Sequence, residues 1–164
     1  MRFLTLVISI MVFSFLVDAQ SGPIAPAKPY VVKTGKQVAD LAKELASQDG
    51  NKNQDIVAAG GMQMRVAVFH DELRENDNFE VHNASDDIYY VLDGKATLAL
   101  GGSLLTPNEI SPGEWRSKSA TGTQKVEVKK GDLVVVPRGT VHQRTVTGKG
   151  FSMVLIKIFE NRQP

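Results

Sequence analysis

From residue 55 almost to the end of the chain, apolar and polar side chains alternate with a period of two. Successive side chains of a β-strand point to opposite faces, so this pattern predicts strands with one buried face. Gly, Pro, Asn and Asp separate the runs, as is typical of turns between short strands. The sequence therefore predicts an all-β body. Its runs span residues 55–60, 62–70, 79–82, 87–102, 125–130, 132–137, 140–146 and 151–160.

One segment before this body follows a helical period instead. Its apolar residues at helical spacing are Val38, Leu41, Ala42 and Leu45. Thr34 and Gln37 have the spacing of a capping box, and Gly50 closes the segment. We expect one amphipathic helix over about residues 36–48, with a packing role and no chemistry.

Two features are expected between the strands. Asp93 followed by Gly94 readily supplies the positive φ angles of a two-residue turn, so a hairpin is expected there. Residues 102–124 form the only long stretch without alternation, and they contain the sole tryptophan, Trp115. A loop of this length could cover the mouth of a pocket.

The first residues have the pattern of a secretory signal peptide. Met1 and Arg2 give a positive start, residues 3–17 are an apolar run, and small Ala19 is placed for cleavage. A membrane anchor is the competing interpretation, but 15 apolar residues span only about 22 Å as a helix, against a hydrocarbon layer of about 30 Å. We therefore expect residues 1–19 to be removed and the protein to be secreted, or periplasmic if it is bacterial.

Composition and charge fit a single exported domain. The chain has 164 residues, of which 42% are hydrophobic and 23% charged, and it has no cysteine. Removal of the leader leaves an extended, proline-rich arm over residues 20–33 and one domain over residues 34–164, long enough to bury a core without disulfides. The formal net charge of +1 argues against nucleic acid or an anionic membrane as a partner, since those contacts need clustered Lys and Arg.

Four side chains on the predicted strands can ligate a metal. Glu80 and His82 are two positions apart and share one face, Asp87 begins the next run, and His142 follows a turn at 137–139. Two imidazoles with carboxylates suit a first-row divalent metal. The alternative is structural: Glu80 then faces solvent, Asp87 belongs to a turn, and the histidines line an empty pocket or satisfy hydrogen bonds in the core.

Residues 131–146 resemble the second motif of the cupin superfamily, G(x)5PxG(x)2H(x)3N. Gly131, Pro137, Gly139 and His142 stand in register, while Val146 stands where Asn is usual. Four of the five fixed positions therefore agree, which makes this a specific match.

The first cupin motif, G(x)5HxH(x)3,4E(x)6G, is matched more loosely. Its fixed positions hold, in order, Arg74, Glu80, His82, Asp87 and Gly94. The second His and the closing Gly agree, whereas Glu80 replaces the first His and Asp87 replaces Glu. Asp is one methylene shorter than Glu, so Asp87 reaches a metal only if the strand shifts inward or a water intervenes.

The resemblance implies a double-sheet barrel of six to eight strands that holds a divalent metal inside. Carried over position by position, the ligands are Glu80, His82, Asp87 and His142. The metal implied is Mn, Fe, Ni or Zn, and two carboxylates favour the harder Mn or Fe over Cu. If Asp87 is not a ligand, it is the candidate catalytic base.

Three further side chains bear on this interior. Tyr89 shares a face with Asp87 and is expected to be part of an aromatic core. Arg65 on a strand and Arg138 in the turn before His142 could hold an anionic substrate, although exposure to solvent is the ordinary role of both.

The function implied is a secreted metalloenzyme of cupin type that acts on a small molecule as an oxygenase, isomerase or lyase. A non-catalytic cupin that binds or stores a ligand or metal is the alternative, and an interaction module built on residues 102–124 is a weaker one. Homodimers are common among cupins, so a homodimer is possible here. The sequence contains no serine hydrolase elbow, phosphate loop or dinucleotide fingerprint.

Overall fold

The computed structural model describes residues 23, 25, 26 and 28–164. The predicted signal peptide, residues 1–19, lies outside the described residues, as do residues 20–22, 24 and 27 of the predicted arm. From Lys28 to Thr34 the chain has no helix or strand, and Tyr30 is almost fully exposed. No helix in the described part is long and apolar enough to cross a membrane.

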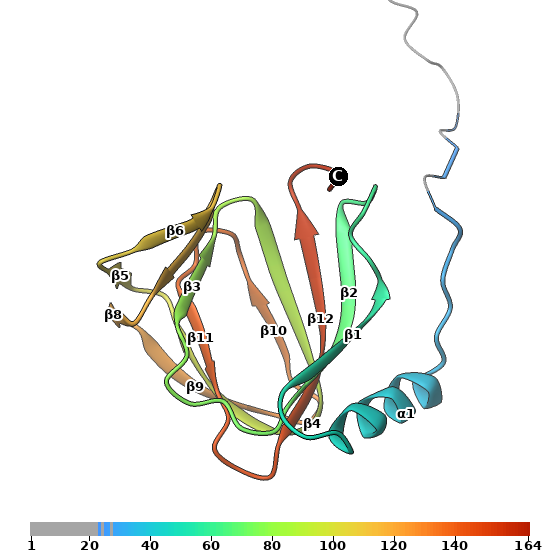
Figure 1. The fold of residues 1–164 in the computed structure, drawn as a ribbon, viewed down its shortest axis with the longest axis horizontal. Coiled ribbons are helices and arrows are strands. Elements are labelled where there is room, and N and C mark those ends of the chain that lie inside the picture. Colours follow the sequence, from blue (N-terminus) through green and yellow to red (C-terminus); the bar gives the residue numbers. More distant parts are fainter. Residues whose placement is uncertain (1–22, 24, 27) are drawn as a thin grey trace, which may run out of the picture.

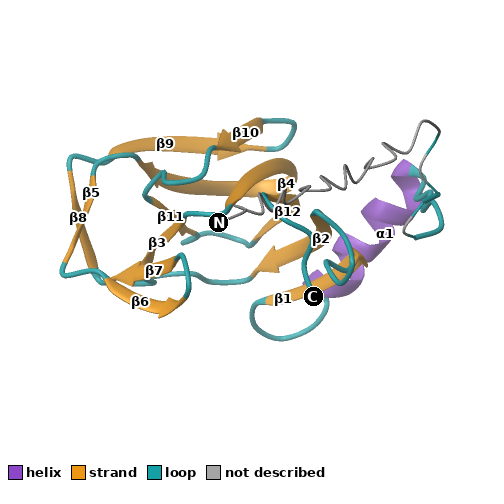
Figure 2. Ribbon diagram, turned by 90° about the horizontal axis from the view of Figure 1, so that it is seen from above, coloured by secondary structure: helices purple, strands orange, loops and turns teal. Residues whose placement is uncertain are grey.

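The predicted all-β body is confirmed, as two antiparallel sheets that share one long strand. The first sheet has the order β1-β2-β12-β4-β10, and the second has the order β9-β4-β11-β3-β7-β6. Figure 1 shows the sheets facing each other as a barrel, and Figure 2 shows the helix α1 and the β5-β8 ribbon at opposite ends of it. The strands are β1 (Lys52–Val57), β2 (Met64–Asp71), β3 (Phe79–His82), β4 (Ser85–Leu100), β5 (Ser103–Leu105), β6 (Asn108–Ser111), β7 (Glu114–Ser117), β8 (Ser119–Thr121), β9 (Gln124–Lys129), β10 (Leu133–Val136), β11 (His142–Thr145) and β12 (Phe151–Phe159).

The predicted helix is present as α1, Gly35–Ala46. The predicted capping box is confirmed, because Thr34 Oγ1 accepts from the backbone N–H of Gln37 and the Gln37 side chain accepts from the backbone N–H of Thr34. Leu45 is buried and clusters with Val68 of β2. Val68 alternates with the residues of β2 that line the interior, so α1 covers the outer side of the sheet.

The prediction of a hairpin at Asp93 and Gly94 is wrong, because β4 continues through this position without a turn. Before Gly94 the strand pairs with β10 and β12, and after it with β9 and β11. A β-bulge between the partners of Ser152 and Met153 accompanies the passage between sheets. Gly94 has φ +74°, and a side chain there would collide with the carbonyl of Gly150. The positive φ that the sequence indicated thus lies within a continuous strand, at its passage from one sheet to the other, and not in a turn.

The long loop expected over residues 102–124 is also wrong. This segment contains the four short strands β5 to β8, and β7 pairs with β3 to extend the second sheet. In none of these strands of three or four residues are two apolar side chains separated by one polar side chain, which explains the missed assignment.

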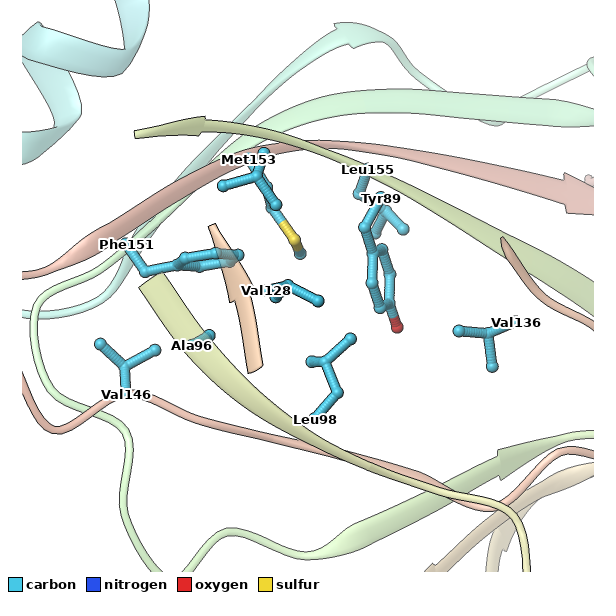
Figure 3. Close-up of a cluster of buried hydrophobic side chains, with 10 residues drawn as sticks. Tyr89, Ala96, Leu98, Val128, Val136, Val146, Phe151, Met153 and Leu155 are labelled. Atoms are coloured by element: carbon cyan, nitrogen blue, oxygen red, sulfur yellow. The ribbon is translucent and has the colours of Figure 1, made fainter. Parts of the chain in front are cut away.

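The core lies between the sheets where β4 passes from one to the other. Figure 3 shows Tyr89 and Leu98 of β4 pointing toward the same interior as Met153 and Leu155 of β12. These four side chains also line an internal cavity. The hydrophobic core therefore forms the floor of the space in which any chemistry takes place.

Candidate metal centre

Three donor side chains meet on the inner face of two neighbouring strands. Glu80 and His82 lie on β3 with one residue between them, and His142 begins β11, directly opposite Glu80. A turn before β11 fixes this placement, because the backbone N–H of Gly139 donates to the carbonyl of His82 over 2.8 Å. Gly139 has φ +77°, which favours glycine at this position of the motif. We call Glu80, His82 and His142 the ligand trio.

The spacing of the ligand trio fits one metal ion. His82 Nε2 and His142 Nε2 lie 3.7 and 3.9 Å from Glu80 Oε2, and one ligand atom from each residue lies within 4.8 Å of the others. Two atoms bound to the same ion at about 2.0 to 2.2 Å can be at most about 4.4 Å apart, so each carboxylate to imidazole spacing allows a shared ion. Both imidazoles are buried, and Glu80 is half-buried.

Hydrogen bonds turn the same ring nitrogen of both histidines toward Glu80. His82 Nδ1 lies 2.6 Å from Glu114 Oε2, and His142 Nδ1 lies 2.9 Å from the carbonyl oxygen of Thr140. Both oxygens only accept, so each Nδ1 carries the proton and each Nε2 keeps its lone pair when the ring is neutral. Burial lowers the pKa of His142, which keeps this imidazole neutral and able to ligate at pH 7.

Asp87 faces the ligand trio from the first sheet. Its Oδ2 lies 3.6 Å from His82 Nε2 and 4.0 Å from His142 Nε2. The same carboxylate is tied to its own sheet, because the Tyr89 hydroxyl donates to Oδ2 over 3.2 Å and Lys157 Nζ lies 2.9 Å from Oδ1. Burial raises the pKa of Tyr89 far above its usual value, so this hydroxyl keeps its proton. Asp87 is therefore close to both imidazoles but belongs to the opposite wall.

The sequence prediction missed three charged residues that contact these groups. Arg116 of β7 is one of them, with its Nη2 3.4 Å from Glu80 Oε2. Glu114 lies in the segment expected to be an irregular loop, and it stands opposite His82 in the pairing of β3 with β7. Lys157 could have been recognised in the sequence, because it is the one charged side chain on a face of β12 that otherwise presents Phe151, Met153 and Leu155.

A cavity of about 350 Å³ surrounds the site. Five basic and three acidic side chains line it, an excess of two positive charges before any metal is counted. The basic residues are Arg65, Arg74, Arg116, Arg144 and Lys157, and the acidic residues are Glu80, Asp87 and Glu114. Trp115 is not part of the lining, whereas its two neighbours on β7 are.

The two arginines singled out from the sequence have different positions. Arg65 lines the cavity, but Arg138 lies outside it and holds Asp86. Its backbone N–H and its Nε both donate to Asp86 Oδ1, and its Nη2 donates to Oδ2 over 2.8 Å. Arg138 therefore fixes the turn before His142 and does not face the cavity.

Solved structures share this architecture. The Bacillus halodurans protein BH2720 superposes with a TM-score of 0.56 at 18% identity, over 84% of this chain and 85% of that one. An uncharacterized conserved protein with a double-stranded beta-helix domain from Klebsiella pneumoniae gives 0.51 at 19% identity, over 74% and 90% of the two chains. The chain has the cupin fold. This confirms the fold that the two sequence motifs predicted.

Another solved structure superposes less closely on this chain. The DMSP lyase DddQ from Ruegeria pomeroyi is a more distant likeness, with a TM-score of 0.49 and 17% identity over 71% of this chain. The chain spans only half the length of that lyase. No protein-family model and no curated protein matches this sequence.

Proposed function

We propose that this cupin binds one divalent transition metal through the ligand trio and acts with it on a small organic molecule. The observation that supports this most is the common direction of the two imidazoles. Glu114 and the Thr140 carbonyl hold the Nδ1 atoms, so that both Nε2 atoms point to the carboxylate of Glu80. If the two histidines served only to make hydrogen bonds in the core, nothing would require three donor atoms to lie at this spacing.

The donor set suggests which chemistry the metal supplies when it is bound. Two imidazoles and one carboxylate leave coordination positions open, as in the centres that use Fe²⁺ with oxygen or Zn²⁺, Ni²⁺ or Mn²⁺ as Lewis acids. This matches an oxygenase, isomerase or lyase. The substrate is small, because a cavity of about 350 Å³ is near the lower limit of ligand sites.

We assign to Asp87 the task of holding and moving a proton. Its carboxylate is buried beside both imidazoles, and the Tyr89 hydroxyl and Lys157 ammonium fix its orientation. A carboxylate in such a dry site can accept a proton from a substrate bound at the ligand trio. Lys157 and Tyr89 are positioning residues in this scheme, since they act through Asp87.

Metal analysis of matched histidine variants tests the proposal. The chain has three histidines, and only His70 lies outside the cavity, where its Nδ1 contacts Ser152 Oγ at 2.9 Å. We expect the purified protein to bind one equivalent of Mn, Fe, Ni or Zn by elemental analysis. His142→Gln should lose it and His70→Gln should keep it, with circular dichroism confirming that both are folded. Metal-free protein that takes up none of the four ions would refute the proposal.

A non-catalytic binding cupin is the second candidate, and the position of Asp87 is what favours it. Its Oδ2 is as close to the imidazoles as Glu80 is, so Asp87 could complete a closed set of four ligands. A crystal of the zinc-loaded protein separates the two functions, because four protein ligands fill the tetrahedral coordination of Zn²⁺ whereas three leave one position open. Three protein ligands with a water support an enzyme, and four protein ligands without water support a binding protein.

We also propose that the protein is exported, on the strength of the leader pattern in residues 1–19. N-terminal sequencing of the protein recovered from its native host tests this. A mature chain that begins near residue 20 supports export, and an intact Met1 in a cytosolic fraction contradicts it.

A further inference from the structure

Two cations of the cavity wall stand directly opposite each other. Arg65 on β2 pairs with Lys157 on β12, and both side chains line the cavity. Like charges at directly opposed positions destabilise an antiparallel pair. Arg116 of β7 also lines the cavity, but its guanidinium lies 3.4 Å from Glu80 Oε2 and 3.5 Å from Glu114 Oε2, so its charge is already offset. Positive charge is thus gathered on the cavity side, where a negative group would offset the repulsion.

Both cations of the pair keep hydrogen-bond donors for a ligand. Lys157 Nζ lies 2.9 Å from Asp87 Oδ1 and donates to Ser85 Oγ over 3.1 Å, whereas an ammonium group has three N–H donors. Arg65 bonds two side chains of β1 through Nε and Nη2, and no hydrogen bond within the described residues uses its Nη1. An anion beside the pair can be held without breaking these bonds.

Apolar surface lies next to the same pair. The Arg65 guanidinium carbon lies 5.6 Å from the ring centroid of Phe69, and Leu155 is two residues before Lys157 on the same face of β12. Both apolar residues line the cavity. A ligand whose negative end reaches the cations therefore meets hydrocarbon wall with the rest of its surface.

We propose that the cavity binds a small organic acid, with its carboxylate held by Lys157 and Arg65 and its apolar body against Phe69 and Leu155. A monoanion suits the site better than a phosphate dianion, because Asp87 and the β1 side chains already offset part of the cationic charge. Only the orientation of the ligand's other end toward the ligand trio rests on the proposed function.

Calorimetric titration with a charged and a neutral probe of the same shape tests this. Hexanoate and hexanamide are titrated into the purified protein, metal-free and zinc-loaded. We expect hexanoate to bind at least about tenfold more tightly than hexanamide in the metal-free protein, where its carboxylate meets only protein donors. Arg65→Gln should weaken hexanoate binding by about fivefold or more. Lys95→Gln removes an exposed cation of β4 outside the cavity and should change it by less than about twofold.

Several outcomes would overturn the inference. These are equal affinity for acid and amide, no detectable binding of hexanoate, or an Arg65→Gln protein that is folded and binds hexanoate as before. Sulfate that displaces hexanoate at equal concentration would show a plain inorganic anion site instead. The measurements on metal-free protein keep the two proposals separate. Hexanoate binding that depends on Arg65 would support this inference even if the protein bound no metal. Metal uptake without hexanoate binding would refute only this inference.

Discussion

Glu114 Oε2 lies 2.6 Å from His82 Nδ1 and accepts a hydrogen bond from its N–H, across the strand pairing of β3 with β7. The carboxylate thereby determines which nitrogen of His82 is available inside the cavity. Arg116 Nη1 lies 3.5 Å from the same Glu114 oxygen, so this carboxylate is itself fixed. The strand that supplies Glu114 thus orients the site without joining the ligand trio.

We predict that Glu114→Gln weakens zinc binding by about tenfold or more, because a neutral amide polarises the imidazole less than a carboxylate does. Competition with a chromophoric chelator measures the affinity, and the visible spectrum of the Co²⁺ form reports the ligand geometry. Glu127→Gln, on the exposed side of β9, is the control and should leave both unchanged. Equal zinc affinity of the Glu114→Gln and wild-type proteins would show that this hydrogen bond does not orient the ligand.

Lys157 and Asp87 form a buried ion pair, with side chains 14% and 5% exposed. Lys157→Met should lower the free energy of unfolding by about 3–5 kcal/mol, because it leaves the Asp87 carboxylate buried without its cation. Adding Asp87→Asn should recover part of this loss, since the uncompensated charge is then gone. Urea unfolding of the metal-free proteins measures all three. A double variant less stable than Lys157→Met would contradict this account of the pair.

Gly94→Ala and Gly101→Ala separate two effects of a glycine with positive φ. Both positions have φ between +74° and +78°, but a Cβ at Gly101 meets nothing within 4 Å, whereas one at Gly94 collides with the Gly150 carbonyl. Gly101→Ala should cost about 1–2 kcal/mol from backbone strain alone. Gly94→Ala should cost about 3 kcal/mol or more. If urea unfolding showed that both variants lose the same free energy of unfolding, the backbone near Gly94 would have moved to accommodate the added Cβ. That result would contradict the predicted cost of the collision.

The Asp86–Arg138 pair should make stability depend on pH in the acid range. Hydrogen bonds from the Arg138 side chain and backbone lower the pKa of Asp86 from 3.8 to about 2. Because the folded pKa is below the unfolded one, the stabilisation is fully present above about pH 4 and is lost as the pH falls toward about 2. Wild type should therefore exceed Asp86→Asn in stability at pH 6, and the difference should shrink at pH 3.

Urea unfolding at both pH values measures that difference. Asp93→Asn, at an exposed carboxylate of β4, is the control and should show no such narrowing. A stability difference between wild type and Asp86→Asn that is constant from pH 6 to pH 3 would contradict the assignment.

The proximity of Glu80, His82 and His142 could be predicted from the sequence because its signals are local. Parity places Glu80 and His82 on one face, and the spacing of Gly131, Pro137, Gly139 and His142 fixes the second cupin motif. The structure brings these segments together at the pairing of His142 with Glu80. Alternation and turn residues can be recognised within short stretches of sequence. This part of the fold could therefore be predicted without knowing which strands pair with each other.

The remaining features depend on partners far away in the sequence. Asp93 and Gly94 suit either a hairpin turn or a strand that passes between sheets, and only the pairing of β4 with β9 and β12 decides between them. Glu114 reaches His82 through the register of β3 with β7, and β7 carries no periodic signal because Trp115 is the only apolar residue among its four. Lys157 could have been found, as a lone cation on an apolar face.

The location of a bound ion tests the central claim most directly. Crystals of the protein loaded with Mn²⁺ or Zn²⁺ should give one anomalous peak about 2.0 to 2.3 Å from the Nε2 atoms of His82 and His142 and from a carboxylate oxygen of Glu80. A distance from the ion to Asp87 in the same map decides whether that residue is a ligand or a base. No peak at the ligand trio, or a peak held by other residues, would contradict the account.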